Sequence, residues 1–142
     1  MRRLVLCSVF AVAALAAGSA GAGSPATFQT PSRNIGCTYV PAGGKDPVYF
    51  RCDIGGGLHP LPPRPKNCDL DWGYGFEMNG ARGRAFPFCA GDTAKDPRAP
   101  VLAYGRTWKR GPFTCLSQTV GLKCSNLAGH GFFLSRQHSY TF

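Results

Sequence analysis

The sequence has few acidic residues and lacks the short motifs that mark most enzyme active sites. Only seven of its 142 residues are acidic, and Glu77 is the only glutamate among them. The G-x-S-x-G nucleophile elbow, the phosphate-binding loop and the glycine pattern of dinucleotide-binding folds are all absent. No two cysteines form a C-x-x-C knuckle, which argues against a zinc site. We therefore expect no metal, no other cofactor and no marked catalytic nucleophile.

Long hydrophobic runs are lacking as well, apart from one at the N-terminus. Arg2 and Arg3 precede an apolar run over residues 4–17, and the small residues GSAGAGS follow it. This order is typical of a secretory signal peptide, and the run is too short to span a bilayer comfortably. We therefore expect residues 1–22 to be a signal peptide and the protein to be secreted, either extracellular or associated with the cell envelope.

The rest of the chain is expected to form one basic domain. Ala22 ends a cleavage site of the A-x-A type, and cleavage before Gly23 leaves residues 23–142. Without the signal peptide the basic residues fall from 16 to 14 against seven acidic ones, a net charge of +7. The same cleavage removes one of seven cysteines and leaves six, an even number that suits a disulfide framework.

Glycine and proline leave little room for helices. The chain has 19 glycines and 12 prolines, and no long amphipathic stretch of helical period follows residue 22. We expect a mainly β fold, a small disulfide-stapled domain of antiparallel hairpins. It would be sandwich-like or barrel-like, with little helix outside the signal peptide.

Strand register places two pairs of cysteines opposite each other. In NIGCTYV and VYFRCDI each cysteine shares a face with its apolar neighbours, and folding about PAGGKDP opposes Cys37 with Cys52. Likewise FTCLSQTVGLKCSN folds about residues 118–121 and opposes Cys115 with Cys124. Opposed residues on antiparallel strands have Cα atoms about 4.5–5.5 Å apart, a separation that a disulfide spans. We expect both pairs to form disulfides.

The two remaining cysteines flank a turn signal. Cys68 and Cys89 lie on either side of Asn79-Gly80, a dipeptide typical of two-residue hairpin turns. They are slightly out of register with that turn, an offset that a β-bulge can absorb. We therefore expect Cys68 to pair with Cys89, which makes three sequential disulfide-closed hairpins.

The C-terminal segment GHGFFLSRQHSYTF is expected to form one closing strand. Its even-numbered positions, from His130 to Phe142, carry most of the apolar side chains and are expected to face the core. Gly129 and Gly131 would form the corner where the chain enters this strand, with His130 as its first inward residue. At about 3.3 Å per residue, His138 would lie roughly 26 Å from His130, too far for a shared acid–base or metal site.

One set of residues offers a route to RNA cleavage by general acid–base catalysis. Glu77 can pair with His130, and Arg82 or Arg84 can stabilise the charge on a phosphate. Nothing in the spacing requires these residues to converge. Glu77 also precedes a predicted turn, where a charge at the end of a strand is expected without any catalytic role.

A pair of carboxylates suggests a second hydrolytic chemistry. Asp69 and Asp71 in CDLDWG lie on one side of an extended segment, as a glycosidase pair would require. Such an enzyme also needs a long sugar-binding cleft, for which a domain of this size has little room. Turn and strand-edge roles are therefore favoured for both residues.

Basic residues occur in small groups, and one group contains a tryptophan. Arg106, Lys109 and Arg110 surround Trp108, and cations beside an aromatic ring can bind phosphates or sugars. We take these four residues and His130 as candidate binding residues. The partner would be an anionic polymer of the cell envelope or another secreted protein. The alternative is a charge that only keeps the protein soluble.

The order of several short motifs carries a resemblance to a known family. FQTPSRNIGC, FRCDI, CAGDT, LAYG, FTC, GLKC and GHGFFLSR together resemble a family of secreted six-cysteine domains of unknown function from actinobacteria, over about Phe28 to Phe142. The resemblance implies a small secreted domain. It implies no activity and assigns no catalytic residue.

These observations favour a non-catalytic extracellular or cell-envelope binding module. Two alternatives stay open at this point. One is a small secreted hydrolase of the ribonuclease kind. The other is a protease inhibitor that presents a stapled loop such as PAGGKDP.

Overall fold

The computed structural model describes residues 24–142. The predicted signal peptide, and the cleavage expected between Ala22 and Gly23, lie outside the described residues. Within the described part of the chain, no helix is long and apolar enough to cross a membrane.

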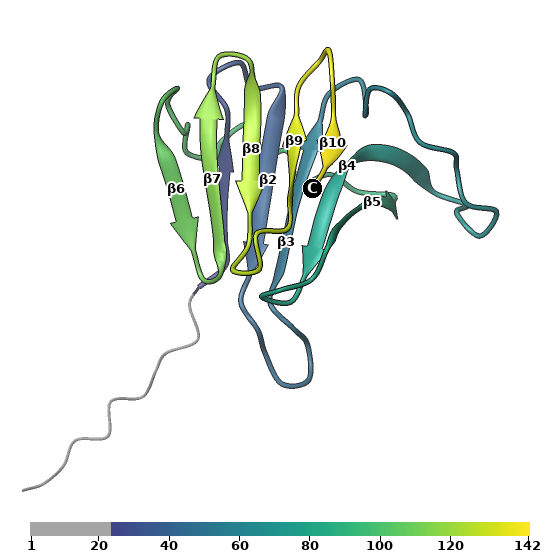
Figure 1. The fold of residues 1–142 in the computed structure, drawn as a ribbon, viewed down its shortest axis with the longest axis horizontal. Helices are drawn as coiled ribbons and strands as arrows, with labels where there is room; N and C mark the ends of the chain where they lie inside the picture. The colour runs from purple at the N-terminus through teal and green to yellow at the C-terminus, as the bar shows by residue number, and fades with distance from the viewer. Residues whose placement is uncertain (1–23) are drawn as a thin grey trace, which may run out of the picture.

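The fold is all-β and consists of two five-stranded antiparallel sheets stacked face to face (Figure 1). The first sheet has the order β1 (Ala26–Gln29), β2 (Ile35–Val40), β3 (Tyr49–Ile54), β4 (Asp71–Asn79) and β5 (Ala85–Ala90). The second has the order β10 (Tyr140–Thr141), β9 (Gly131–Leu134), β8 (Gly121–Ser125), β7 (Phe113–Gln118) and β6 (Thr107–Arg110). Each sheet is a meander, and the described strands form an open sandwich, not a closed barrel.

The core between the sheets is built from alternating side chains. In β7 the burial alternates residue by residue, with Phe113, Cys115 and Ser117 facing inward. Phe50 of β3 lies at the centre, with its ring centroid 5.1 Å from that of Phe113 and 6.2 Å from that of Phe132. All three rings are fully buried, so the two sheets are joined by packed aromatic side chains.

Three disulfides cross the hairpins, and they are the pairs expected from the sequence. Cys37–Cys52 and Cys115–Cys124 join residues directly opposite each other on neighbouring strands, each with a Cα–Cα distance of 4.1 Å. These four cysteines are fully buried in the core. The third disulfide, Cys68–Cys89, has a Cα–Cα distance of 5.8 Å and ties the segment before β4 to β5.

The two-residue turn predicted at Asn79-Gly80 is wrong. The connection between β4 and β5 spans residues 80–84, and the register of the two strands shifts along their length. The longer loop reaches the other sheet, because the Asn126 side-chain amide donates to the Gly83 carbonyl oxygen over 2.6 Å.

The single closing strand predicted at the C-terminus is also wrong. The chain forms β9, turns over residues 135–139 and folds back as β10 along β9. The Ser135 hydroxyl closes this turn, since it donates to the His138 carbonyl oxygen and accepts from the His138 N–H. The extended separation inferred for His130 and His138 therefore does not apply, and the inward pattern ends at Leu134.

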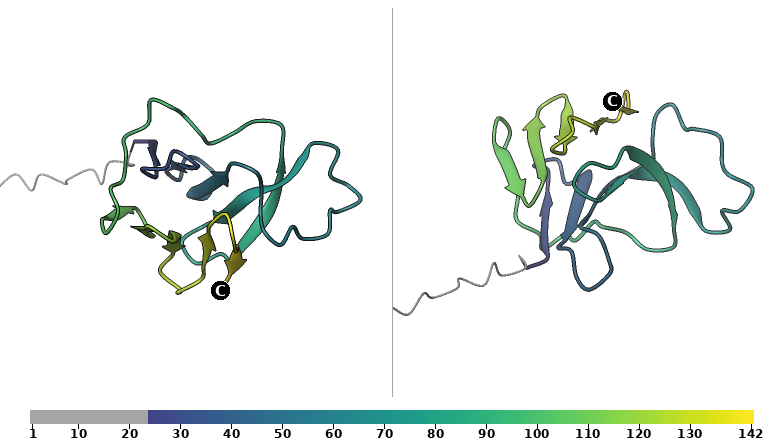
Figure 2. Two further views of the ribbon diagram at one scale, coloured as in Figure 1. Left: turned by 90° about the horizontal axis from the view of Figure 1, so that it is seen from above. Right: turned by 60° about the horizontal axis from the view of Figure 1, so that its bottom comes forward.

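The segment that joins the sheets, residues 91–106, forms a strap over the outer face of the first sheet (Figure 2). A Cβ atom on Gly36 in β2 would lie 2.7 Å from the Lys95 Cα atom, so glycine allows the strap to lie directly on the strand. Further on, the strap runs beside β1, where the Gln29 N–H donates to the Pro100 carbonyl oxygen. The first sheet is thereby covered on both faces across β2 and β3.

Candidate binding surface

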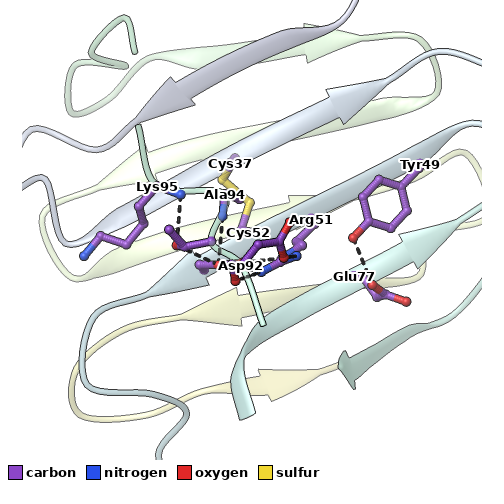
Figure 3. Close-up of polar contacts among 10 residues, drawn as sticks. Cys37, Tyr49, Arg51, Cys52, Glu77, Asp92, Ala94 and Lys95 are labelled. Carbon is purple, nitrogen blue, oxygen red and sulfur yellow. Dashed lines mark hydrogen bonds and ion pairs between the residues drawn. A yellow bond between two sulfur atoms is a disulfide. The ribbon is translucent and has the colours of Figure 1, made fainter. Parts of the chain in front are cut away.

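A charged cluster lies buried between the first sheet and the strap. Phe50, Cys52 and Ile54 of β3 face the core, so Arg51 and Asp53 project from the opposite face. Arg51 Nε and Nη2 donate to the two carboxylate oxygens of Asp53 over 2.7 and 2.9 Å. Both residues are almost fully buried because the strap covers them. Figure 3 shows the Arg51 side chain directed at the strap residue Asp92.

The buried side chains of this cluster also have hydrogen-bond partners on the strap. Asp53 also accepts from the Thr93 hydroxyl and the Ala94 N–H, both over 2.9 Å. Arg51 donates to the Asp92 carboxylate and to its carbonyl oxygen, both over 2.8 Å. Burial alone would lower the pKa of Arg51, but the hydrogen bonds to Asp53 and Asp92 outweigh it and hold the pKa above its ordinary value. The cluster therefore fixes the strap, and its buried carboxylate is already engaged by donors from β3 and the strap.

A cavity lies beside this cluster and is a weak candidate site. It has a volume of about 430 Å³, and its lining includes Asp53, Asp71, Tyr74, Phe88 and Lys95. Asp53 is saturated, and the Phe88 ring lies 4.1 Å below the Arg51 guanidinium carbon. Asp69 is not part of this lining, so the proposed carboxylate pair does not meet here. Among residues 24–142 no group of three metal-ligating side chains occurs.

The proposed hydrolase residues do not form one site. Glu77 lies on the outer face of the first sheet, where its carboxylate accepts from the Tyr49 hydroxyl over 3.0 Å and from the Asn79 side-chain amide over 3.3 Å. Burial and the negative charge of Glu77 raise the pKa of Tyr49, so the phenol stays protonated. His130 belongs to the second sheet, in the loop before β9.

The loops that carry the other members of this set do approach each other. The hydrogen bond from Asn126 to Gly83 brings the loop that contains His130 against the loop that contains Arg82 and Arg84. His130 is half-buried there, and its carbonyl oxygen accepts from the Asn126 N–H over 2.9 Å. Without Glu77, this junction lacks the carboxylate that the acid–base scheme requires.

The candidate binding residues are divided among four places. Trp108 packs inward, with its ring centroid 4.8 Å from that of Phe28, and Arg110 projects to the same side of β6. Lys109 lies between them in β6 and projects to the outer face. Arg106 is exposed just before β6, and His130 lies in the loop between β8 and β9.

Aromatic and basic side chains lie together on the outer face of the second sheet, and the sequence analysis did not predict this grouping. Strand pairing places Tyr140, Phe133, Lys123, Leu116 and Thr107 in one row from β10 to β6. In contrast to the first sheet, no strap from residues 24–142 crosses this face, which points toward the viewer in Figure 1. The row is therefore available to a partner.

A second row runs parallel to the first. It contains Phe142, Gly131, Ser125, Thr114 and Lys109, and hydrogen bonds in both directions join the backbones of Phe142 and Gly131. We call the exposed or half-buried members of the two rows the aromatic–basic face: Thr107, Lys109, Thr114, Leu116, Lys123, Ser125, Phe133, Tyr140 and Phe142.

Two glycines let aromatic rings lie across this face. A Cβ atom on Gly121 would lie 2.5 Å from the Phe133 ring, and one on Gly131 would lie 2.8 Å from the Phe142 ring. Phe133 stacks on Tyr140 with a centroid distance of 5.5 Å. The Lys123 ammonium lies 5.0 Å from the centroid of Phe142. The rings and the lysine thus form one contiguous patch.

A model described as "Family of unknown function (DUF6636)" matches residues 5–142, which is nearly the entire sequence. The chain belongs to DUF6636. No curated protein and no solved structure matches it. The family relation thus leaves the function to be inferred from the surface of this DUF6636 domain.

The distribution of charge along the DUF6636 chain is uneven, and sequence analysis missed it. All seven acidic residues lie between Asp46 and Asp96, and none follows. Residues 97–142, which include the whole second sheet, carry six basic residues: Arg98, Arg106, Lys109, Arg110, Lys123 and Arg136. This run without an acid was visible in the sequence, but only the fold shows that most of it, residues 107–142, forms a separate layer. The aromatic–basic face therefore lies in a region of a single charge sign.

Proposed function

We propose that this protein is a secreted, non-catalytic module that binds an anionic polymer of the cell envelope through the aromatic–basic face. One observation carries the proposal: an uncovered sheet surface combines lysines, hydroxyls and aromatic rings in a layer that contains no acidic residue. A layer of this kind attracts negative charge and gives a polymer flat surfaces to contact.

The dimensions of the face suit an extended polymer more than a small molecule. Neighbouring strands are about 4.8 Å apart, so the five strands from β6 to β10 span roughly 19 Å. Lys109 and Lys123 can contact phosphate or carboxylate groups, while Tyr140 and Phe142 can contact the apolar faces of sugar rings. Thr114 and Ser125 supply hydroxyl groups between them. Successive units of an anionic glycan would meet each type of contact in turn.

The absence of acidic residues in this layer supports binding without catalysis. Hydrolysis by acid–base chemistry needs a positioned acid or base near the reacting bond. No side chain of the aromatic–basic face is a carboxylate. Among residues 24–142, His138 is the histidine whose ring lies near this face, 5.4 Å from Tyr140 between centroids.

Three disulfides in a small domain are consistent with an extracellular location. The basic N-terminal segment with its apolar run supports secretion, and the composition supports an actinobacterial source. In that setting the net positive charge would hold the protein at an anionic cell surface.

Equilibrium binding to defined polymers tests the proposal. We expect retention on alginate, a carboxylated glycan, at low salt and release as the salt concentration rises, because exposed charges are screened within about 10 Å at 0.1 M. Dextran, a neutral glycan, should bind weakly. The double variant Lys109→Gln with Lys123→Gln should weaken alginate binding roughly tenfold, about 1.4 kcal/mol.

Matched variants separate a surface effect from a loss of net charge. Lys45 and Lys66 are exposed in loops of the first sheet, so Lys45→Gln with Lys66→Gln removes the same charge elsewhere. Tyr140→Ala tests the rings, with Tyr104→Ala as its control, because the two side chains are similarly exposed at 44% and 42%. Equal losses in the two double variants, or equal losses in the two tyrosine variants, would contradict the proposed face.

A further inference from the structure

An apolar groove lies at the open edge of the sandwich, between β1 and β6. These are edge strands of their respective sheets, and they do not pair with each other. The strap forms one wall, since Gln29 N–H donates to the Pro100 carbonyl oxygen over 2.9 Å and Leu102 N–H donates to the Gln29 carbonyl oxygen over 2.8 Å. The groove has a volume of about 380 Å³, within the range of small-molecule sites.

The walls of the groove are hydrophobic and include an aromatic floor. Phe28, Pro100, Val101, Leu102 and Trp108 line it. Phe28 and Trp108 meet at a centroid distance of 4.8 Å, and Trp108 also stacks on the buried core. Val101 is 52% exposed at the rim, so the groove opens to solvent. Such a surface favours a ligand with an apolar body.

The polar side chains of the groove are the Arg110 guanidinium and the Trp108 indole, which donate, and the Thr27 hydroxyl, which can donate or accept. Arg110 is the only charged residue in the lining, and no described residue forms an ion pair with it. The Trp108 indole N–H has no acceptor among residues 24–142, whereas the Trp72 indole donates to the Pro62 carbonyl oxygen over 2.9 Å. No acidic residue lines the groove, so a bound anion would meet a guanidinium without a competing charge.

We propose that this groove binds a small carboxylic acid with an aromatic or aliphatic body. The carboxylate pairs with Arg110, and the body lies against Trp108 and Phe28. Apolar walls with one convergent cation are the usual composition of a site for an amphipathic anion. This site uses side chains outside the aromatic–basic face, so its test and the test of polymer binding succeed or fail independently.

Tryptophan fluorescence reports this site directly. The chain has two tryptophans, and Trp72→Phe leaves Trp108 as the single indole. Titration of that variant with 4-phenylbutyrate should give a saturable change in Trp108 emission. Arg110→Gln in the same background should weaken the affinity about tenfold, because it removes a charge-assisted hydrogen bond. The neutral analogue 4-phenylbutanol should bind equally weakly whether or not the Arg110→Gln substitution is present.

Arg98→Gln is the matched control, because Arg98 lies on the strap near the groove but outside its lining. It should leave 4-phenylbutyrate affinity within about twofold of the parent, the effect expected of an exposed charge. If Trp72→Phe fails to fold, the indole N–H resonances of the unmodified chain provide the same titration by NMR. An unsaturable response, or equal weakening by Arg98→Gln and Arg110→Gln, would overturn the proposal.

Discussion

Neutralising Asp53 should destabilise the protein much more than neutralising Asp92, although both carboxylates pair with Arg51. The Asp53 side chain is 3% exposed and the Asp92 side chain is 82% exposed. Asp53→Asn leaves the buried guanidinium without its main counter-charge, and breaking a buried pair of this kind costs about 3–5 kcal/mol. Because Arg51 keeps its contact with Asp92, we expect a loss of about 3 kcal/mol. Asp92→Asn removes an exposed partner and should cost below about 1 kcal/mol.

Urea unfolding followed by circular dichroism measures both losses at pH 7. A domain of this size has a total stability of about 5–15 kcal/mol, so a loss of about 3 kcal/mol is well resolved. The double variant Arg51→Met with Asp53→Leu should recover part of the loss, since no buried charge remains unpaired, although the Thr93 hydroxyl and the Ala94 N–H lose their acceptor. If Asp53→Asn lowered the unfolding free energy by less than about 1 kcal/mol, the strap would not depend on a buried ion pair.

Three further predictions concern the framework. Gly75→Ala should lower the unfolding free energy in urea by about 2 kcal/mol or more, because its Cβ atom would lie 1.9 Å from the Cys52 carbonyl oxygen. The control Gly43→Ala should be nearly neutral, since its Cβ atom meets nothing within 4 Å, and equal losses in the two variants would refute the close approach at Gly75. Arg51 lowers the pKa of Asp92 by donating a hydrogen bond to its carboxylate and by attracting its negative charge. The difference in unfolding free energy between wild type and Asp92→Asn should therefore persist at pH 7 and shrink as the pH falls below about 4. A difference that grows toward low pH would contradict a lowered pKa. Replacement of both Cys115 and Cys124 by alanine removes a disulfide whose cysteines are 9 residues apart in sequence. The added entropy of the unfolded chain should lower the unfolding free energy by about 2.6 kcal/mol, and a loss below about 1 kcal/mol would contradict this entropic contribution.

The sequence predicted the structure correctly where paired strands alternate strictly between buried and exposed side chains. Cys37 and Cys52 share a face with apolar neighbours, so only one register satisfies both the disulfide and the core, and the structure has that register. The same constraint fixed the hairpin that contains Cys115 and Cys124. Local pattern was sufficient in both cases, because the contacts involved lie within one hairpin.

The errors came from side-chain hydrogen bonds, one between distant segments and one within a local turn. Asn79-Gly80 has strong turn chemistry, yet the loop is longer because Gly83 contacts the other sheet through Asn126. The closing strand alternates without interruption, yet the Ser135 hydroxyl ends it with a local turn. Periodicity describes which face a residue takes within a strand, and it contains no information about where a polar side chain closes a turn.

The aromatic–basic face could not be predicted from local sequence patterns, because it is assembled from several strands. Its members come from five strands, and their rows exist only once the order of the second sheet is known. Trp108 illustrates the difficulty, since its basic neighbours suggested an exposed stacking surface, whereas it packs against Phe28 at the edge of the core. The charge asymmetry after Asp96 was the one signal in the sequence that pointed to this layer.

Mapping of alginate binding on the protein by NMR tests the central claim most directly. At low salt, we expect the largest amide shift changes at Lys123, Phe133 and Tyr140, with smaller changes at Lys109 and little change in β2 and β3 beneath the strap. These changes should disappear in the Lys109→Gln and Lys123→Gln double variant at the same polymer concentration. Changes centred on the first sheet, or none on the aromatic–basic face, would contradict the proposed function.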